Sequence, residues 1–423
     1  MAGDPEIEPA SAGSPSASEV LAAGMGDSPT DFNPFLPEVN EDPYPLYERM
    51  RSLDPVHWNL PGVWMLTRHA DAVRMLRHPR MSSDFRNSEL FEMFREMNFP
   101  LDEREPSMLF RDPPDHTRLR NLVSKAFSPK VIDSMRPFIA EVVDRLLAEA
   151  AGRETFDLVT ELAHPLPVIL ICEMLGVPAE DQHLFSRWSD DLVHTLDPMV
   201  GPDVMQRGTE SELAFGSYFR ALIAERRTAP RNDLLSALIA AEEEGERLSE
   251  EELLRTLILL LVAGHETTVN LISNGMLALL RNRSQLERLQ EDPSLLRSAV
   301  EELLRYDSPV QLTSRVALEP MEFGDRPVRK GQHVVALVGA ANRDPEQFPD
   351  PDRLDLGRAD NKHIAFGGGI HFCLGASLAR AEGQAAIGTL VARFPQLEPA
   401  GETERRDTIT LRGLKRFPVA LGS

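Results

Sequence analysis

Cysteine is nearly absent from this sequence: its 423 residues include only Cys172 and Cys373. The two lie far apart and form no pairing motif, so no disulfide framework is predicted and a reducing, cytoplasmic setting is indicated. Cys172 follows the apolar run 168–171 and is expected to pack in the core. Cys373 is therefore the one thiol available for chemistry.

Positive charge is also scarce. The chain has 45 Lys and Arg residues against 67 Asp and Glu residues, a formal net charge of −22. Nucleic-acid binding depends on clustered positive charge that contacts phosphates. The composition therefore excludes a general nucleic-acid-binding protein and favours a protein that repels other acidic surfaces.

Long apolar runs are missing as well. The most apolar stretch, residues 257–263, is far shorter than the ~20 residues that cross a bilayer, so no membrane anchor is expected. Residues 1–30 lack the apolar segment of a secretory signal and are rich in Ala, Gly, Ser, Pro and Asp. We expect a disordered leader there and a single domain over residues 31–423.

The sequence around Cys373 joins two unlike segments. Glycines 367–369 precede it, and good helix formers, residues 376–381, follow it. Glycine allows a positive φ and lets the backbone approach a flat group closely. A cysteine at a helix start faces the positive end of the helix dipole, which favours the thiolate. An isolated thiolate suits one axial metal bond; the alternative is a buried structural thiol.

A longer pattern favours the metal ligand. The spacing of six residues resembles the haem-ligand signature of the cytochrome P450 family, in its soluble bacterial form: Phe366, Gly367, Gly369, His371, Cys373 and Gly375. The resemblance implies haem b (iron protoporphyrin IX) with Cys373 as the axial iron ligand and with Phe366, Gly367, His371 and Gly375 as cofactor-binding residues. It covers about residues 34–420. It implies a mainly α fold with small β-sheets (α+β), a triangular prism with the haem between two central helices.

A second segment presents basic side chains. Two prolines before Asp115 predict a helix start, and His116 and Arg120 share one face of that helix. Such a face binds a carboxylate or is simply solvated. The resemblance assigns His116, Arg120 and Arg315 to the haem propionates. Three further basic residues are expected to add a docking patch for an acidic electron donor: Arg118, Lys125 and Lys130.

A long helix is predicted from a capping box, with Ser249 at N-cap and Glu252 at N3, and its pattern runs to about Leu280. Its middle, residues 263–268, is unusual because Gly264 and the threonines are weak helix formers. Such residues indicate a groove where a ligand approaches and the helix ladder opens, or a close helix contact at Gly264.

Residues 263–268 also resemble the oxygen-activation motif of the same family. The resemblance implies that Glu266 and Thr267 are catalytic and relay protons to dioxygen, while Ala263 and Gly264 leave space for it beside the haem. Three other residues resemble the family's structural Glu-x-x-Arg element and its later arginine: Glu302, Arg305 and Arg353.

Apolar side chains outside these motifs point to the substrate. Residues 82–110 look irregular and carry Phe85, Phe91 and Phe94, which form either a core-facing helix or a mobile lid over an apolar ligand. The resemblance favours the lid and places three aliphatic residues near the substrate: Val310, Leu312 and Leu414. Leu414 is expected at the turn of a last hairpin over residues 408–419. Terpenoids, steroids, fatty acyl chains and macrolides all fit such a lining.

The remaining pattern predicts a framework for these motifs. Helices are expected over residues 42–50, 71–76 and 295–306, and throughout 131–245. A hairpin is expected over residues 56–66, and strands over 310–315 and 328–337 with a turn at Lys330–Gly331.

Together these elements imply a haem-thiolate monooxygenase that inserts one oxygen atom of O2 into an apolar small molecule, by hydroxylation or epoxidation, in secondary metabolism. Electrons are expected from a ferredoxin and its reductase, or from a flavoprotein, and the enzyme is expected to be a monomer. Two alternatives stay open: a peroxide-driven haem-thiolate enzyme and a non-catalytic haem protein that binds a gas or lipid. The acid–alcohol pair Glu266–Thr267 argues against both.

Overall fold

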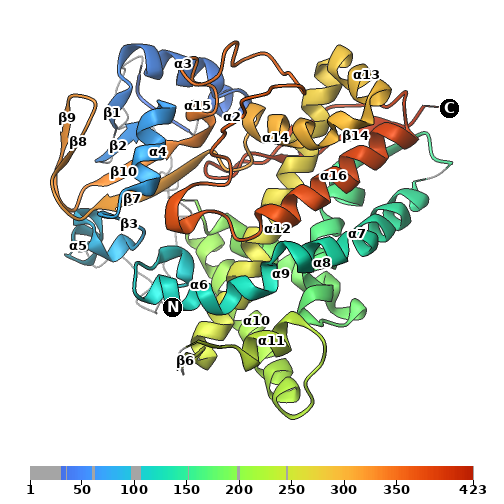
Figure 1. The fold of residues 1–423 in the computed structure, drawn as a ribbon, viewed down its shortest axis with the longest axis horizontal. Coiled ribbons are helices and arrows are strands. Elements are labelled where there is room, and N and C mark those ends of the chain that lie inside the picture. Colours follow the sequence, from blue (N-terminus) through green and yellow to red (C-terminus); the bar gives the residue numbers. More distant parts are fainter. Residues whose placement is uncertain are drawn as a thin grey trace, which may run out of the picture.

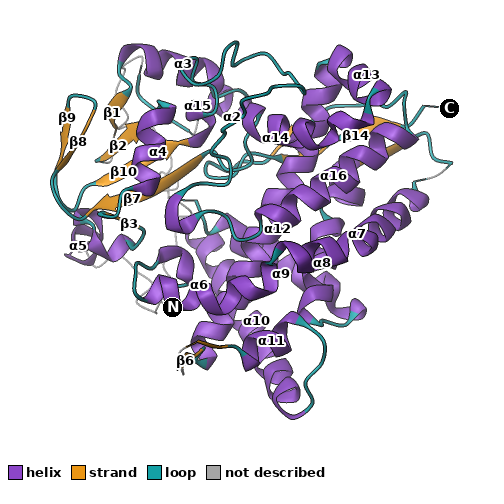
Figure 2. Ribbon diagram, in the orientation of Figure 1, coloured by secondary structure: helices purple, strands orange, loops and turns teal. Residues whose placement is uncertain are grey.

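A computed structural model of the chain describes residues 30–34, 36–59, 62–96, 106–150, 152–197, 201–243 and 246–422, so nearly all of the predicted leader lies outside it. Helices fill most of the molecule, and the largest sheet lies at one side (Figure 1). Figure 2 shows the same segregation of strands from helices. The outline narrows toward α10 (Pro202–Thr228) and α11 (Leu234–Ala240). This confirms the predicted mainly α fold with small sheets.

The central element is α12 (Glu250–Arg281). Ser249 Oγ accepts a hydrogen bond from Glu252 N, and the Glu252 carboxylate accepts one from Ser249 N, so the predicted capping box is confirmed. The helix is long and apolar enough to cross a membrane, but 72% of its most apolar window is buried inside the protein. It is therefore a core helix. It packs most extensively against four other helices: α8 (Pro165–Leu175), α9 (Gln182–His194), α14 (Leu296–Tyr306) and α16 (Ala376–Arg393).

The main sheet has the strand order β1-β2-β10-β7-β3. These strands are β1 (Val56–Asn59), β2 (Val63–Leu66), β10 (His333–Leu337), β7 (Leu312–Ala317) and β3 (Met81–Ser82). β1 and β2 pair antiparallel, which confirms the predicted hairpin, although residues 60 and 61 of its turn lie outside the described ranges. β10 runs parallel to β2 and antiparallel to β7. The sheet buries one face against α3 (Tyr44–Leu53) and the other against α4 (His69–Arg77).

The other elements frame this core. Further helices are α2 (Pro37–Glu41), α5 (Glu89–Glu96), α6 (Asp115–Ser124), α7 (Pro129–Glu149), α13 (Arg283–Glu291) and α15 (Val338–Ala341). Single-turn segments, 3-10 or π in geometry, are Phe85–Asn87, Met108–Phe110, Lys125–Phe127, Val159–Ala163, Ala179–Asp181, Pro293–Leu295 and Gly369–His371. Small sheets pair β4 (Thr155–Asp157) and β11 (Glu398–Pro399) with β14 (Pro418–Ala420), β5 (Glu242–Glu243) with β6 (Glu246–Arg247), β8 (Met321–Phe323) with β9 (Arg326–Val328), and β12 (Glu404–Arg405) with β13 (Leu414–Arg416).

Three local predictions need correction. Residues 82–110 are not uniformly irregular, because they contain helix α5. Residues 131–245 are not helical throughout, because β4 lies within them and pairs with β14 from the far end of the chain. The last hairpin joins β12 to β13 through residues 406–413, so Leu414 begins a strand and is not the turn residue. In the second and third cases the pairing partner is distant or irregular, which short-range patterns do not reveal.

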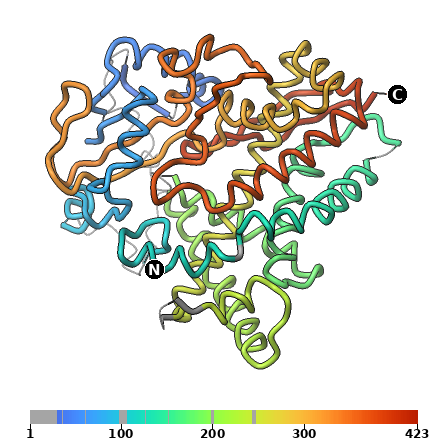
Figure 3. The backbone as a smooth tube through the Cα atoms, in the orientation of Figure 1, coloured from blue at the N-terminus to red at the C-terminus, as the bar shows by residue number. Residues whose placement is uncertain are grey.

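The segment that carries Cys373 reaches the middle of the molecule. Figure 3 shows the orange-red stretch before α16 looping from the sheet side toward the centre, where α16 packs on α12. The thiol loop and the unusual middle of α12 therefore belong to one central region.

Candidate active site

The loop before Cys373 depends on two glycines. Gly367 and Gly369 have φ values of 70° and 65°, in the left-handed region that other residues rarely adopt. A Cβ added at Gly369 would lie 2.3 Å from the backbone oxygen of Leu76, so no larger residue fits between this loop and α4. The Cys373 amide donates to the Phe366 carbonyl at 2.9 Å, which closes the loop. The predicted use of positive φ is confirmed.

The thiol itself sits at the start of α16, as predicted. Burial raises the pKa of Cys373, and the backbone N–H groups of Gly375 and Ala376 and the charges of Arg120 and Arg380 oppose that rise. Without a bound cation, burial outweighs the helix-start effect that the sequence suggested. A thiolate here therefore requires a positive partner such as an iron ion. Sequence reasoning missed Arg380, whose guanidinium lies 4.4 Å from the centre of the Phe366 ring.

Basic side chains converge beside this loop from three elements. The rings of His116, on α6, and His371 lie 4.1 Å apart, and Arg120 Nη2 donates to the Phe372 carbonyl at 2.5 Å. Arg315, on β7, is buried, which lowers its pKa to about 10. Within the described ranges, no carboxylate accepts a hydrogen bond from His116, Arg120, Arg315 or His371.

The three residues predicted to bind propionates, His116, Arg120 and Arg315, are thus brought together with His371, and the group has unmet donor capacity. His116 Nδ1 and His371 Nε2 are buried without a hydrogen-bond partner among the described residues. Burial lowers the pKa of His371 to about 3, and Arg315, His116 and Arg120 add to the shift. A site that gathers two arginines and two unpaired imidazole nitrogens in this way calls for groups that accept hydrogen bonds. Two propionate groups supply that chemistry.

The middle of α12 faces open space. Ala263 and Gly264 are exposed although the residues on either side of them in the helix are buried. A Cβ added at Gly264 or at Gly375 would meet no atom within 4 Å. The helix itself is uninterrupted, so the expected opening of its ladder is wrong: Thr267 Oγ1 instead donates to the Ala263 carbonyl at 2.7 Å. Open glycines, basic side chains without acidic partners among the described residues and the Cys373 thiol together fit a haem.

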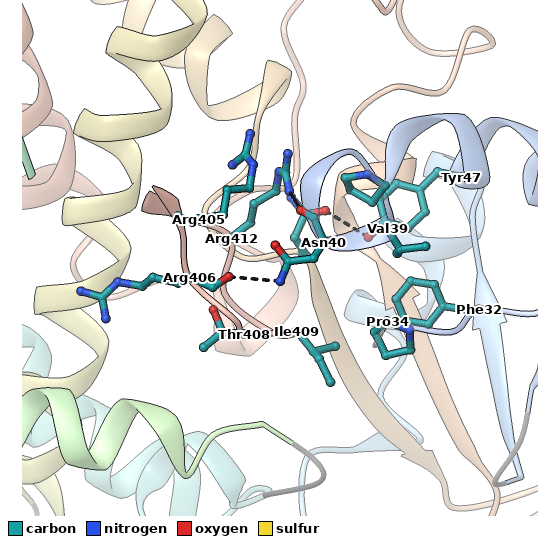
Figure 4. Close-up of a pocket in the computed structure, with 13 residues that line it drawn as sticks. Phe32, Pro34, Val39, Asn40, Tyr47, Arg405, Arg406, Thr408, Ile409 and Arg412 are labelled. Carbon is teal, nitrogen blue, oxygen red and sulfur yellow. Dashed lines mark hydrogen bonds between the residues drawn. The ribbon is translucent and has the colours of Figure 1, made fainter. Parts of the chain in front are cut away.

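Glu266 has a partner that sequence reasoning missed. Its carboxylate is buried and lies 2.9 Å from Nε of Arg406, from the loop between β12 and β13. Burial raises the pKa of Glu266, and the Arg406 charge opposes that rise. Figure 4 shows why Arg406 points this way: its side chain extends toward α12, while its carbonyl accepts from Asn40 Nδ2 at 3.2 Å. Arg412 Nη1 donates to the Asn40 carbonyl at 2.6 Å, so Asn40 contacts both ends of the loop between β12 and β13.

An apolar cluster packs where α12 meets α9 and the loop between β12 and β13. Its buried members are Leu192, Val193, Val262 and Leu411, and Ile258 and Val310 pack against them. Val310 therefore packs against the cluster that contains Val262, the residue before the open stretch at Ala263. The sequence did not mark Leu411 as a member of this cluster. Leu411 forms an isolated antiparallel bridge with Val310, and that pairing appears only in the folded chain.

Two other predicted substrate residues lie elsewhere. Leu414 is fully buried in the main core and does not reach the apolar cluster. Because the loop between β12 and β13 ends at residue 413, Leu411 and not Leu414 faces the cluster. Leu312 packs against Phe32, Tyr47 and neighbouring residues on the α3 face of the sheet.

The three phenylalanines form a cluster of their own. The ring of Phe85 lies 5.8 Å from that of Phe91, 6.4 Å from that of Phe94 and 5.1 Å from that of His333. All three phenylalanines are half-buried. They lie on a short helical turn and α5, on a segment that covers the end of the sheet rather than the main core.

The structural triad has a different third member. Arg305 makes two hydrogen bonds of 2.8 Å to the fully buried Glu302. Arg358 Nε completes the set at 3.1 Å from Glu302 Oε2. Arg353 is wrong for this place: its side chain is 67% exposed and pairs with Asp355. Only its carbonyl joins the triad, as an acceptor for Arg305 and Arg358.

The predicted basic patch is smaller than expected. Arg118 is paired with Glu252 at the start of α12, so it is not available to a docking partner. Lys125 and Lys130 are exposed. Next to Cys373, the loop exposes two large apolar side chains, Ile370 and Phe372, at 52% and 43%.

These features define a haem-thiolate protein, and comparison with known sequences supports that assignment. Residues 39–416 match the family model described as Cytochrome P450. The chain belongs to the cytochrome P450 family, binds haem as the family does, and is a monooxygenase.

Relatives and solved structures agree over almost the full length. The chain is 44% identical over 407 residues to cytochrome P450 107B1 of Saccharopolyspora erythraea, covering 93% of this chain and 98% of that one. It is 44% identical over 400 residues to the vitamin D(3) 25-hydroxylase of Pseudonocardia autotrophica, covering 90% and 94%. It matches the crystal structure of the myxobacterial cytochrome P450 CYP267B1 in complex with myristic acid, with a TM-score of 0.85, 44% identity, and coverage of 92% and 98%.

Proposed function

We propose that this enzyme hydroxylates or epoxidises an apolar small molecule bound between α12 and the C-terminal loop. The observation that carries the proposal is the apolar cluster of Leu192, Val262, Val310 and Leu411 beside the exposed Ala263 and Gly264. For hydroxylation, a substrate C–H bond, O2, two electrons and two protons give C–OH and water. Burial of an apolar substrate against this cluster supplies binding energy without a specific polar contact.

Cys373 is the proposed axial ligand. The other cysteine, Cys172, is buried in the main core, where burial raises its pKa to about 12. When bound, haem supplies the iron that activates dioxygen, and an axial thiolate favours O–O bond cleavage. His116, Arg120, Arg315 and His371 would hold the propionates through the donors that lack acceptors.

Glu266 and Thr267 are the proposed proton donors on the opposite side. The raised pKa of Glu266 lets its carboxyl hold a proton nearer to neutral pH than an exposed glutamate does. The Thr267 hydroxyl lies on the open face of the helix and donates to Ala263 O in this structure. Rotation of that hydroxyl would turn its proton from the helix carbonyl to the open face.

The surface around Cys373 is the proposed docking site for an electron donor. Ile370 and Phe372 are exposed beside the thiol loop, and Lys125 and Lys130 lie exposed after α6. An apolar centre with basic residues near it suits an acidic ferredoxin, delivered electrons by its reductase, or a flavoprotein. We place the enzyme in the cytoplasm as a monomer; among the described residues, the one helix long and apolar enough to cross a membrane is mostly buried inside the protein.

Steroid-like molecules and fatty acyl chains are the proposed substrates. One relative is named for hydroxylating vitamin D3, and one related structure holds myristic acid. Both ligands present long apolar surfaces, as the apolar cluster demands. The half-buried rings of Phe85, Phe91 and Phe94 are proposed as a lid that adapts to such shapes.

The test has two stages. Purified haem-loaded enzyme is titrated with vitamin D3, testosterone and myristic acid, and the blue shift of the haem band reports substrate entry. Ligands that bind are then incubated with ferredoxin, reductase, NADPH and 18O2. One labelled oxygen atom in the product supports the proposal.

Two outcomes would count against it. Product formed only with hydrogen peroxide would favour a peroxide-driven enzyme. Band shifts without any product from either oxidant would favour a non-catalytic binding protein. Leu411→Asp should abolish binding of the apolar ligands. Leu312→Ala is the control that should retain binding, because Leu312 packs against a separate cluster on the α3 face of the sheet.

A further inference from the structure

A second polar cluster lies on the side of α12 away from the open face. His265 comes from α12, Asp190 from α9, and His164 from the junction just before α8. Each offers one donor atom, and these atoms all lie within 4.8 Å of one another. The His164 and His265 rings meet edge to face, with centres 4.4 Å apart. Three segments that are distant in the sequence thus converge on one point.

Serines of α9 orient both imidazoles. His265 Nδ1 lies 2.7 Å from Ser189 Oγ, and His164 Nδ1 lies 3.5 Å from Ser186 Oγ. A histidine that ligates a metal typically donates its other ring N–H to a neighbouring acceptor, which fixes the ring and its tautomer. Serine acceptors at Nδ1 leave both Nε2 lone pairs for the cluster.

The free nitrogen of His265 is not satisfied by the protein. His265 is fully buried, and its Nε2 has no hydrogen-bond partner among the described residues. The other histidine already aims at the acid, since His164 Nε2 lies 3.2 Å from Asp190 Oδ1. A buried polar atom directed into a cluster of donors indicates a missing ligand, because leaving it unpaired costs ~1–3 kcal/mol.

Access and charge also suit a cation. The side chain of Asp190 is 42% exposed and that of His164 is 19% exposed, so the cluster opens to solvent on one side. Asp190 brings a carboxylate to the two imidazoles. The guanidinium of Arg406, which is paired with Glu266, is close enough to act on the charges of Asp190 and His265.

We propose that His164, Asp190 and His265 bind one divalent transition-metal ion of the zinc type, with water completing its coordination. Two imidazole nitrogens and one carboxylate are a donor set that zinc takes in tetrahedral sites. Donor atoms that share one zinc ion lie about 3.4 Å apart, from bond lengths of ~2.0–2.2 Å. The distance of 3.2 Å from His164 Nε2 to Asp190 Oδ1 is already close to this spacing. The remaining donor atoms lie within 4.8 Å, so side-chain adjustments on the order of 1 Å would bring all three onto one ion.

This site is separate from the haem site and takes different chemistry. Its ligands lie on the α8 and α9 side of α12, whereas the thiol and the basic residues lie toward α6, α16 and the sheet. A metal ion there would cross-link α9, which carries Leu192 and Val193 of the apolar cluster, to the central helix. Bound zinc is therefore expected to fix one wall of the substrate site.

The test measures zinc binding by the haem-loaded enzyme after removal of metal ions with a chelator. Zinc chloride is titrated by calorimetry, and the bound metal is counted by elemental analysis after dialysis. We expect one equivalent per chain. His164→Gln and Asp190→Asn should each weaken binding at least tenfold, while the haem spectrum and circular dichroism stay unchanged.

A matched control uses the same helix. His183 lies on α9 and is exposed, and its Nδ1 lies 2.7 Å from the Glu180 carbonyl. His183→Gln should bind zinc as the unmodified enzyme does. A crystal soaked in zinc should show anomalous scattering among the three ligands. Absence of a bound equivalent would overturn the proposal, and so would equal affinity in His164→Gln, Asp190→Asn and His183→Gln.

Discussion

Replacement of Arg358 by methionine tests the structural triad most directly. Glu302 is fully buried and accepts hydrogen bonds from Arg305, from Arg358, from Asn361 and from the Asp355 amide. Arg358→Met removes one of the two cations on that carboxylate. It also removes the Arg358 Nη1 bond of 2.8 Å to the Pro349 carbonyl.

The size of the effect follows from burial. Breaking a buried ion pair by removing one partner costs ~3–5 kcal/mol because it leaves an uncompensated charge. Arg305 remains in this case, so we expect the free energy of unfolding to fall by about 2–4 kcal/mol. Arg358→Lys should lower the free energy of unfolding by less than Arg358→Met does, because an ammonium keeps the charge but not the planar fork of donors.

Arg353→Met is the matched control. Arg353 lies in the same loop, but its side chain is 67% exposed and makes a surface pair with Asp355. Such pairs contribute about 0–1 kcal/mol. Urea unfolding followed by far-UV circular dichroism and by haem absorbance measures both variants. Equal losses in Arg353→Met and Arg358→Met, or a loss below ~1 kcal/mol in Arg358→Met, would refute the assignment of Arg358 to the triad.

Four further predictions follow from the site. Cys373→Ser should remove the absorbance band of the reduced carbon monoxide complex that marks thiolate ligation; a persisting band would exclude Cys373 as ligand. Thr267→Ala should raise the ratio of hydrogen peroxide released to product formed, measured against NADPH consumed, and an unchanged ratio would argue against proton delivery by this hydroxyl. Arg406→Gln removes the charge that opposes the raised pKa of Glu266, so this pKa should rise further. In the pH profile of product formation, the decline that follows ionisation of Glu266 should then move to higher pH. Burial raises the pKa of Glu382 to about 8. In this pH range the folded state therefore keeps a proton on Glu382 that the unfolded state loses above pH ~4.3. The free energy of unfolding should then fall as pH rises from ~4.5 to 8, by up to ~1.4 kcal/mol per pH unit. Urea unfolding at several pH values measures this slope, and Glu382→Gln should abolish it.

Features encoded in short stretches were predictable from the sequence. The capping box at Ser249 and Glu252 sets the start of α12, because the two residues satisfy each other's backbone donors. Gly369 was recognisable as a residue with positive φ, since its loop precedes a cysteine and a helix. His116 and Arg120 were placed on one helix face by their spacing alone. Each of these inferences needs only residues within a few positions of each other.

Features that depend on distant partners were not predictable in the same way. Arg353 and Arg358 occupy one loop and have the same chemistry, and only the fold decides which one turns inward to Glu302. Arg406 reaches Glu266 from a loop that is anchored by Asn40 near the start of the chain. No local pattern links these three segments, so the ion pair appears only once the chain is folded.

The middle of α12 presents different side chains to different neighbours. Successive residues are rotated by about 100° around a helix with 3.6 residues per turn. Ala263, Gly264 and Thr267 therefore fall within one arc of about 100°, and this arc is the exposed one. His265 and Glu266 fall outside it, where one meets α9 and the other meets Arg406. The ion pair with Arg406 at 2.9 Å holds the Glu266 carboxylate outside this arc. On the proposed role of Glu266 as a proton donor toward Thr267, its carboxyl would have to leave Arg406 first, so we expect the strength of that pair to set how readily the acid serves the open face.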